Sequence, residues 1–411
     1  MIPRILVVDD DAALRFTLRG ILEDAGYAVD EAADGALALE KIDAGGDYHL
    51  VLSDLRMPNV DGMTLLERVK QRSGPRFIMI TAHGSERAAV EAIKRGAYDY
   101  FRKPFEPDEL LSVVERAVES VRLGAAKEEL AAELLLSRSM VFASRAMKQL
   151  AVLAQRVASK DVTVLITGES GTGKERLAEA LVRGSARAKR PFVRFNCAAI
   201  TPELAEAELF GHTKGAFTGA VRERAGLFRE AHTGTLFLDE IAELDLRTQA
   251  KLLRVLQEGE LRPVGEDRPL SIDVRILAAT HRDLAQCVKD GSFREDLFYR
   301  LKVVNLHLPP LRERSEDIEV LAGHFLDQYA SRFGAGPFTL DDAVRAKLSS
   351  HRWPGNVREL SNAIESLVAL SPPDRLDASL LPGSSQVTRA TLEHRLAAYE
   401  RGLLVDAIAE A

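Results

Sequence analysis

A short apolar strand that runs into a glycine-rich loop constrains this 411-residue chain more than any other feature. Residues 162–167 are β-branched and apolar, which is typical of a buried strand, and the loop at 168–173 follows directly. Glycines in such a loop let consecutive backbone N–H groups face a phosphate, and Lys174 then reaches the β and γ oxygens. The pattern predicts a strand, a phosphate-binding loop and a helix in that order.

A second apolar strand, residues 234–238, ends in the acids that hydrolysis would need, Asp239 and Glu240. We expect Asp239 to hold Mg²⁺ and Glu240 to polarise the attacking water. Glu175 replaces the Ser or Thr that usually follows the lysine, so Mg²⁺ would depend more on water, the phosphates and this strand. A chance glycine-rich turn and a strand with solvated acids are the alternatives, but the two motifs together favour an ATPase.

A glycine-flanked hexapeptide lies between these two motifs. It consists of Gly215, Ala216, Phe217, Thr218, Gly219 and Ala220. Gly215 and Gly219 permit unusual backbone angles, so the segment can hinge, and Phe217 would be a large apolar group at a loop tip. This pattern favours a contact surface for another macromolecule. The alternative is a tight turn whose Phe217 folds back into the core.

The N-terminal residues carry an independent signature in which polar side chains follow short apolar strands. These side chains are Asp9, Asp10 and Asp11 after 5–8, Asp54 after 51–53, Thr81 after 77–80, and Lys103 after 98–101. Strands that alternate with helices predict a parallel, doubly wound sheet whose ligands gather at the carboxyl ends of the strands. Clustered carboxylates need a cation such as Mg²⁺, and Asp54 is placed as a nucleophile toward a phosphoryl donor. A flavodoxin-like domain with merely solvated acids is the alternative.

Composition sets the remaining bounds. The net charge of −7 argues against a global basic surface for nucleic acid, and 46% hydrophobic residues support real cores. Cys197 and Cys287 are too few for a disulfide framework, so we expect buried thiols in a reducing cytoplasm. We find neither a signal peptide nor an apolar stretch of transmembrane length, and we expect no membrane contact.

A helix-forming connector covers about residues 106–136. Its apolar residues keep a heptad-like spacing at Leu110, Val114, Ala117 and Val121. Gly124 then interrupts this spacing. We favour a helix that pairs with a second copy of the chain, although the same stripe could pack on the chain's own N-terminal domain.

With these motifs in hand, residues 139–372 resemble the AAA+ domain of the NtrC-type, sigma-54-dependent transcription activators. Residues 1–120 resemble a response-regulator receiver domain. The resemblance implies an α/β protein with a flavodoxin-like, doubly wound receiver and a central AAA+ α/β P-loop ATPase with a small helical lid. The implied domains are the receiver at 1–120, a helical linker at 121–138, the ATPase subdomain at 139–305, the lid at 306–372, and the start of a Fis-like C-terminal domain at 388–411.

The receiver resemblance assigns roles to the N-terminal polar residues. It implies that Asp9, Asp10 and Asp54 bind Mg²⁺ and that Asp54 is phosphorylated. Thr81 and Lys103 would contact the phosphoryl group, Tyr100 would be the switch aromatic, and the bond between Lys103 and Pro104 would be cis.

The AAA+ resemblance assigns further roles around ATP and Mg²⁺. Asn196 would restrain the catalytic Glu240, Thr280 and His281 would be the sensor of the γ-phosphate, and Arg358 would be the sensor of the lid. Arg294 and Arg300 match the arginine fingers that a neighbouring subunit supplies. The implied ATP-binding loop is Gly168, Glu169, Ser170, Gly171, Thr172, Gly173, Lys174 and Glu175. Residues 140–145 depart from the Gly and Ser-Pro that the family usually has near the adenine.

The resemblance also implies partners. The first is sigma-54 RNA polymerase, contacted through residues 215–220, and the second is a cognate sensor histidine kinase. The third is other copies of the chain, in an inactive dimer or in an active hexameric or heptameric ring. DNA would be contacted through a C-terminal domain missing from this chain, which stops within the first helix of the Fis-like region. Two other functions stay open: a remodelling ATPase with a different target, and a non-catalytic phosphorylation switch or scaffold.

Overall fold

The computed structural model describes residues 2–70, 75–82, 86–213, 223–266, 268–372 and 375–382. The chain divides into two compact units, Met1–Glu128 and Glu129–Ala411, which are described separately. The hexapeptide at 215–220 and the C-terminal segment at 388–411 lie outside the described residues.

The first unit is built around a five-stranded sheet of order β2-β1-β3-β4-β5, in which all pairs are parallel. Its strands are β1 (Arg4–Val8), β2 (Ala28–Ala32), β3 (Leu50–Asp54), β4 (Arg76–Thr81) and β5 (Asp99–Arg102). Its helices are α1 (Ala12–Asp24), α2 (Gly35–Asp43), α3 (Gly62–Lys70), α4 (Glu86–Arg95) and α5 (Pro107–Ser137).

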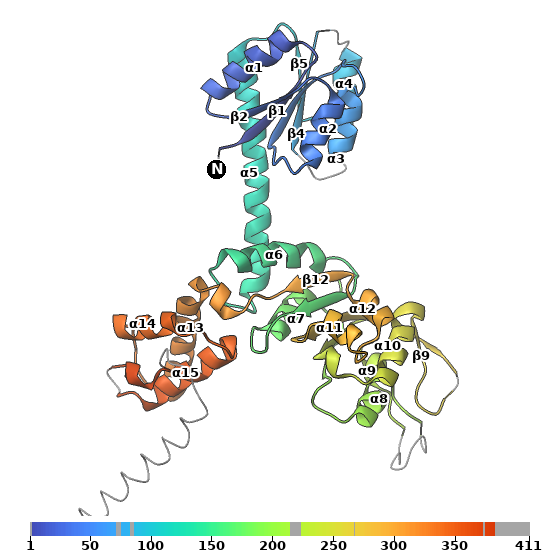
Figure 1. Ribbon diagram of the computed structural model, residues 1–411, viewed down its shortest axis with the longest axis vertical. Coiled ribbons are helices and arrows are strands. Elements are labelled where there is room, and N and C mark those ends of the chain that lie inside the picture. Colours follow the sequence, from blue (N-terminus) through green and yellow to red (C-terminus); the bar gives the residue numbers. More distant parts are fainter. Residues whose placement is uncertain are drawn as a thin grey trace, which may run out of the picture. The chain divides into compact units, whose positions relative to one another are not determined.

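Side-chain alternation along β1 explains the two layers of helices. Ile5 and Val7 face a core formed with α1 and α5, whereas Leu6 and Val8 face a core formed with α2, α3 and α4. Figure 1 shows these two groups of helices on the two faces of the sheet. Both faces of the sheet are therefore covered, and polar residues collect at the carboxyl ends of the strands. The expected doubly wound fold is confirmed.

Helix α5 corrects our interpretation of the connector. Leu110, Val114 and Ala117 are fully buried in the core of the first unit, so this part of the stripe packs on the chain's own receiver sheet. The helix continues through Gly124, which has open space around it. Heptad-like spacing marks one apolar face of a helix but does not say which surface covers that face.

The second unit contains another five-stranded parallel sheet, of order β12-β6-β11-β8-β7. Its strands are β6 (Val164–Thr167), β7 (Phe192–Asn196), β8 (Thr235–Asp239), β11 (Arg275–Thr280) and β12 (Val304–His307), with a small hairpin of β9 (Glu260–Leu261) and β10 (Leu270–Ser271). Its helices are α6 (Arg145–Ala158), α7 (Lys174–Arg183), α8 (Pro202–Phe210), α9 (Leu227–Glu230), α10 (Leu246–Glu258), α11 (Leu284–Lys289) and α12 (Glu295–Leu301).

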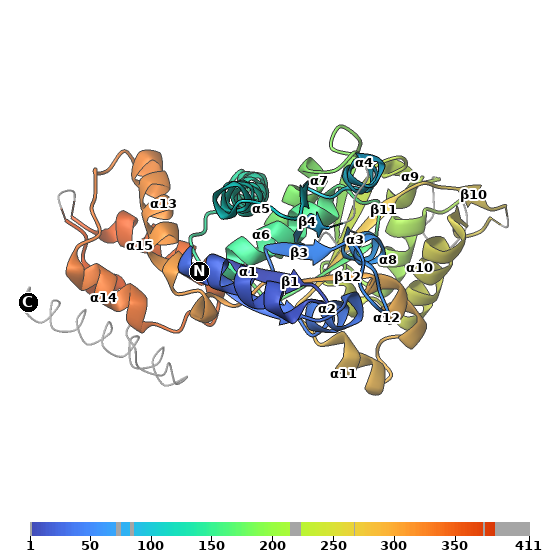
Figure 2. The same ribbon diagram turned by 90° about the horizontal axis from the view of Figure 1, so that it is seen from above.

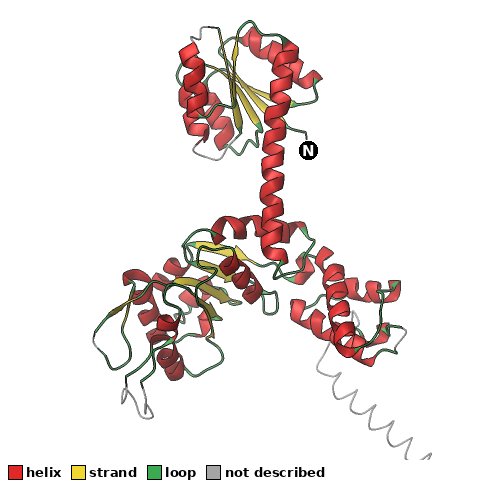
Figure 3. Ribbon diagram, turned by 180° about the vertical axis from the view of Figure 1, so that it is seen from behind, coloured by secondary structure: helices red, strands yellow, loops and turns green. Residues whose placement is uncertain are grey.

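Helices again cover both faces of this second sheet (Figure 3). One face packs on α6, α7 and the last turns of α5, where Ala132 and Leu136 are fully buried. The other face packs on the helices from α8 to α12. The β6 strand therefore lies inside the sheet and delivers the glycine-rich loop to its carboxyl edge.

A separate helical cluster completes the second unit (Figure 2). It comprises α13 (Glu316–Phe333), α14 (Asp342–Ser350) and α15 (Asn356–Leu370). Trp353 lies at its centre, 1% exposed, and its indole N–H donates to the carbonyl of Leu348 at 2.9 Å. This cluster has its own apolar core, as expected for a lid.

Candidate active sites

The acidic residues of the first unit meet at the carboxyl edge of its sheet. Strands β1 and β3 pair in the register Val8 to Ser53, so the next residues, Asp9 and Asp54, are neighbours. Lys103, which follows β5, bridges them: its Nζ donates to Asp9 Oδ2 and to Asp54 Oδ1, both at 2.7 Å. The other oxygen of Asp54 accepts the N–H of Arg56 at 2.7 Å. The bond between Lys103 and Pro104 is cis, as expected.

Electrostatics in this cluster reflect burial. Burial raises the pKa of Asp9 above its ordinary value, although the hydrogen bond from Lys103 opposes this change. Burial alone would lower the pKa of Lys103, but hydrogen bonds to Asp54 and Asp9 outweigh it and raise that pKa. Burial is the largest single influence on the pKa of both groups, but at Lys103 the contributions of the two carboxylates together outweigh it.

The cluster suits Mg²⁺ in kind, because its donors are carboxylate oxygens already gathered around one positive charge. Asp10 is exposed beside it. Within the described ranges, no three acidic, histidine or cysteine side chains are grouped so that they could hold a metal ion. Lys103 lies between the two buried carboxylates, which explains why the expected ligands are not arranged around a common point.

Thr81 and Tyr100 extend this site along the neighbouring strands. Thr81 is buried at the end of β4, directly after Ile80, which pairs with Asp54. Tyr100 pairs with Met79 in the register of β4 and β5. Its hydroxyl is buried and has no hydrogen-bond partner among the described residues. A buried hydroxyl without a partner costs free energy in this arrangement.

In the second unit, the glycine-rich loop surrounds its own lysine. Gly168, Gly171 and Gly173 all have positive φ angles, which only glycine adopts readily. Lys174 is 7% exposed, and its Nζ donates to the carbonyls of Gly168 at 3.0 Å and Glu169 at 3.3 Å. The hydrogen bonds of the ammonium group thus go to two neutral carbonyl oxygens, which an anionic phosphate can replace.

Asp239 and Glu240 lie beside this lysine at the end of β8. Glu240 has φ of 52°, which is strained for a residue other than glycine, and its Oε1 lies 3.6 Å from Lys174 Nζ. Burial and the charge of Glu240 raise the pKa of Asp239. Burial would raise the pKa of Glu240 as well, but hydrogen bonds from His281 and the charge of Lys174 hold it below its ordinary value. Glu240 therefore stays ionised beside a less acidic Asp239.

The expected partners of Glu240 are only partly brought to it. Asn196 pairs with Asp239 across β7 and β8, and its Oδ1 accepts the N–H of Ala198 at 2.9 Å. No hydrogen bond joins Asn196 to Glu240 in the described part of the chain. His281 contacts Glu240 instead, with Nδ1 at 2.6 Å from Oε2. Thr280 is buried, and its hydroxyl accepts the N–H of Arg282 at 3.0 Å.

The lid contacts four successive residues of the phosphate loop. Arg312 donates twice to Glu169, at 2.7 and 2.9 Å, and Arg358 donates to the hydroxyl of Ser170 at 3.1 Å. Asn356 Nδ2 also donates to Glu169 Oε2 at 3.1 Å. Three contacts go to loop carbonyls: Asn356 Nδ2 to Ser170 at 3.0 Å, Val357 N–H to Gly171 at 3.0 Å, and Arg314 to Thr172 at 2.9 Å.

Sequence reasoning named Glu169 as part of the ATP-binding loop and Arg358 as the sensor of the lid, but it gave no role to Arg312, Arg314 or Asn356. One signal was present for Arg314, because Asp317 follows it at the i+3 spacing of a helical ion pair. Nothing in the sequence pattern marks Arg312 or Asn356 as partners of the loop.

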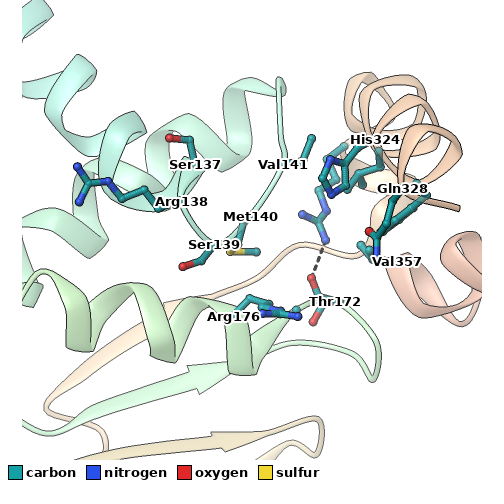
Figure 4. A pocket seen from close by; sticks show the side chains of 14 residues that line it. Ser137, Arg138, Ser139, Met140, Val141, Thr172, Arg176, His324, Gln328 and Val357 are labelled. Atoms are coloured by element: carbon teal, nitrogen blue, oxygen red, sulfur yellow. Dashed lines mark hydrogen bonds between the residues drawn. The ribbon is translucent and has the colours of Figure 1, made fainter. Parts of the chain in front are cut away.

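A cavity of about 330 Å³ lies between the lid and the phosphate loop. Its walls include Met140, Val141, Thr172, His324 and Gln328 (Figure 4). The dashed line in Figure 4 marks the hydrogen bond from Arg314 to Thr172. Met140 and Val141 belong to the segment 140–145, which departs from the family pattern. This segment therefore lines a pocket with both apolar and polar walls next to the loop, in a place suited to a nucleotide base.

The two expected arginine fingers are exposed and form hydrogen bonds within this chain. Arg294 forms a bidentate salt bridge with Asp296, from Nε to Oδ1 at 3.0 Å and from Nη2 to Oδ2 at 2.7 Å. Arg300 donates to the carbonyl of Leu256 at 2.8 and 3.2 Å. Glu175 is also engaged, with Arg194 at 3.0 Å.

Comparison with known proteins assigns families to these parts. Residues 5–115 match the response regulator receiver domain, 140–307 the sigma-54 interaction domain, and 312–397 the AAA+ ATPase lid domain. The DNA-binding transcriptional regulator NtrC of Azospirillum brasilense is 47% identical over 89% of this chain and 76% of its own length. The transcriptional regulatory protein ZraR of Klebsiella oxytoca is 47% identical over 92% of this chain and 85% of its own length.

A solved structure is also similar over most of the chain. It is NtrX from Brucella abortus in complex with ATP, 40% identical, with a TM-score of 0.55 over 93% of this chain and 84% of that one. Among the described residues, no helix has the length and apolar content that crossing a membrane requires.

Proposed function

We propose a function from one premise: this chain belongs to the NtrC-type family of response regulators, with a receiver, a sigma-54 interaction domain and an AAA+ lid. Phosphorylation of Asp54 by a cognate sensor kinase controls the assembly of an ATP-hydrolysing ring. The ring remodels sigma-54 RNA polymerase in the cytoplasm and so starts transcription.

The main support for the proposed ATP hydrolysis is that Lys174, Asp239 and Glu240 lie together at one edge of the second sheet. Lys174 exchanges its loop carbonyls for the β and γ oxygens of ATP, which are charged and bind an ammonium more strongly. Glu240 is the ionised acceptor that takes a hydrogen bond from the attacking water. The cavity beside Met140 and His324 accommodates the base. Asp239 would hold Mg²⁺, which neutralises charge on the transferring phosphoryl group.

Hydrolysis depends on assembly, because the arginine fingers act on the neighbouring subunit. Arg294 and Arg300 are exposed and pair with Asp296 and a backbone carbonyl rather than with the phosphate loop of their own subunit. A trans-acting guanidinium contributes on the order of 10³-fold or more in related phosphoryl transfers. Arg294→Ala is therefore expected to lower hydrolysis in the ring by about that factor.

In the receiver, an oxygen of Asp54 bonds to the phosphorus of the donor while the bond from that phosphorus to the donor's leaving group breaks, so the phosphoryl group passes to Asp54 and the leaving group stays with the donor. Lys103 stays beside Asp54 and neutralises part of the added charge, while Asp9 and Asp10 would hold Mg²⁺. On the neighbouring strands, Thr81 contacts the new phosphoryl group and Tyr100 changes its position in response. Asp54→Asn is expected to abolish labelling by acetyl phosphate, and labelling that persists would place the phosphorylation site elsewhere.

We further propose that the unphosphorylated receiver restrains ring assembly, so removing it raises ATPase activity. The structure supports a particular boundary for this deletion. Ala132 and Leu136 are buried in the core of the second unit, so the deletion should end at residue 128 and leave these side chains in place. An inactive monomeric fragment would show that the receiver promotes assembly.

One pair of substitutions tests the link to sigma-54. Thr218 lies in the hexapeptide, outside the phosphate loop and the acidic strand, so Thr218→Ala should leave ATP hydrolysis within a small factor of wild type. It should abolish open-complex formation by sigma-54 RNA polymerase. Glu240→Ala should instead block hydrolysis while nucleotide still binds. If Thr218→Ala lost both activities equally, the hexapeptide would be structural and another target would have to be sought.

A further inference from the structure

A short turn, residues 351–355, joins α14 to α15 within the lid (Figure 1). Asn356, which begins α15, donates from Nδ2 to the carbonyl of Ser170 in the phosphate loop at 3.0 Å. The turn itself packs on the loop, because a Cβ at Gly171 would lie 2.3 Å from the carbonyl oxygen of Gly355. The shape of this turn therefore decides whether the donors at the start of α15 reach the loop.

The backbone around this turn is strained. Trp353 has a φ of 51° and Asn356 has a φ of 54°. Both angles lie in the left-handed region, which glycine enters readily and bulkier residues rarely adopt. Backbone of this kind persists only where the surrounding contacts hold it in place.

Side chains of the lid supply such contacts. The backbone N–H of Trp353 donates to Nδ1 of His351 at 3.0 Å. The N–H of Gly355 donates to Oε2 of Glu359 at 2.7 Å, which satisfies a backbone donor at the start of α15. The strained angle at Trp353 thus depends on an acceptor that the side chain of His351 provides.

The imidazole of His351 is itself held firmly. Its ring lies edge-on against the ring of Trp353, with centroids 4.6 Å apart and an interplanar angle of 67°. Because Nδ1 accepts an N–H, the ring hydrogen is on Nε2, which lies 3.8 Å from Oε1 of Glu359. The side chain is 11% exposed, so its neighbours leave it little freedom to turn away.

We infer that His351 is a positioning residue for nucleotide binding, a role that rests on the proposed binding of ATP. Its Nδ1 holds the strained turn in the shape that brings the start of α15 to the phosphate loop. Without this acceptor, the N–H of the buried Trp353 loses its partner and the turn relaxes. The donors of α15 then move off the loop, and ATP binds more weakly.

The expected defect is in binding rather than in hydrolysis. In the described part of the chain, no hydrogen bond or ion pair joins His351 to the phosphate loop, to Asp239 or to Glu240. Loss of the imidazole should therefore raise KM and leave kcat within about twofold.

The test compares His351→Ala with His351→Asn in the full-length chain, by direct titration with a non-hydrolysable ATP analogue. Ala removes the acceptor. Asn restores it, because residue 351 has an extended backbone, with φ of −85° and ψ of 142°, from which an Asn oxygen can accept the N–H two residues on. A neutral hydrogen bond is strong enough to weaken binding about three- to tenfold in His351→Ala. His351→Asn should bind within about twofold of the wild type.

Ile364→Val is the matched control for a general loss of lid stability. Ile364 is fully buried on α15, so removing one methyl group destabilises the lid by about as much as a lost hydrogen bond. The turn keeps its contacts in this variant, so the analogue should bind with wild-type affinity. Urea midpoints, followed by the emission of Trp353, measure how closely the two variants match in stability.

A wild-type chain that failed to bind the analogue would overturn the proposed function itself. If wild type bound it and His351→Ala bound it equally well, the inference alone would be wrong. The inference would also be wrong if Ile364→Val lost as much affinity as His351→Ala, because binding would then follow lid stability. A loss in His351→Asn as large as that in His351→Ala would overturn it too, since the restored acceptor would have no effect.

Discussion

Asp317→Asn is expected to destabilise the lid selectively. Asp317 is fully buried, and its Oδ1 accepts the N–H groups of Ala143 at 2.6 Å and Ser144 at 2.7 Å. Its other oxygen accepts the Ser144 hydroxyl and lies 3.6 Å from Arg314, which is 1% exposed. The asparagine would leave the buried guanidinium without a counter-charge, which costs about 3–5 kcal/mol in measured cases.

This cost converts into a measurable shift. With a urea dependence of about 2 kcal/mol per molar for a small domain, the midpoint of lid unfolding should fall by about 2 M. Trp353 is the single tryptophan of the chain and lies in the lid core, so its emission in a urea titration reports this transition locally.

Asp327→Asn is the control for this experiment. Asp327 is exposed on the same helix, α13, so its substitution should change stability by no more than about 0.5 kcal/mol. That change corresponds to about 0.3 M urea. Equal midpoints for the two variants would refute the reasoning, because the buried charge would then contribute no more than a surface one.

Three further predictions concern the loop, the receiver and α5. Gly171→Ala should weaken ATP binding by at least about tenfold in a direct titration, because the added methyl would lie 2.3 Å from a lid carbonyl at a φ of +78°, whereas Gly323→Ala has open space and should bind normally. Asp9→Asn should raise the thermal midpoint of the receiver at pH 7. Burial raises the pKa of Asp9 in the folded state, so its charge destabilises the fold above that pKa, and the advantage of the variant should vanish as the pH falls toward about 4. Leu136→Ala should cost the ATPase unit about 2–5 kcal/mol in urea titrations, and the exposed Leu134→Ala should cost far less; equal losses would place Leu136 outside the core.

Much of the receiver could be predicted from the sequence because parallel strands carry their carboxyl ends to one edge. That rule predicts that Asp9, Asp54 and Lys103 lie together, and the structure joins them through one ammonium group. Their roles in phosphorylation stay predictions. Lys174 and Glu240, which the sequence motifs assign to one expected ATPase site, are neighbours in the structure.

Contacts between distant segments could not be predicted in this way. Glu169 meets Arg312 and Asn356 across more than 140 residues, and no periodic pattern encodes such a meeting. The prediction that the apolar stripe at Leu110 and Val114 pairs with a second copy of the chain was wrong for another reason. Spacing reports that a helix has an apolar face, while the identity of the covering surface depends on the tertiary fold.

The lid's hold on the phosphate loop has a consequence for how an anion is received. A trans peptide is planar and points its carbonyl and the following N–H in opposite directions. By fixing the carbonyls of Ser170, Gly171 and Thr172, the lid also fixes the direction of the next three N–H groups. The cradle for phosphate is thus preorganised from behind, and nucleotide binding need not bear the entropy of ordering it. A variant that loosened the lid would lose affinity for ATP without touching a single residue that contacts it.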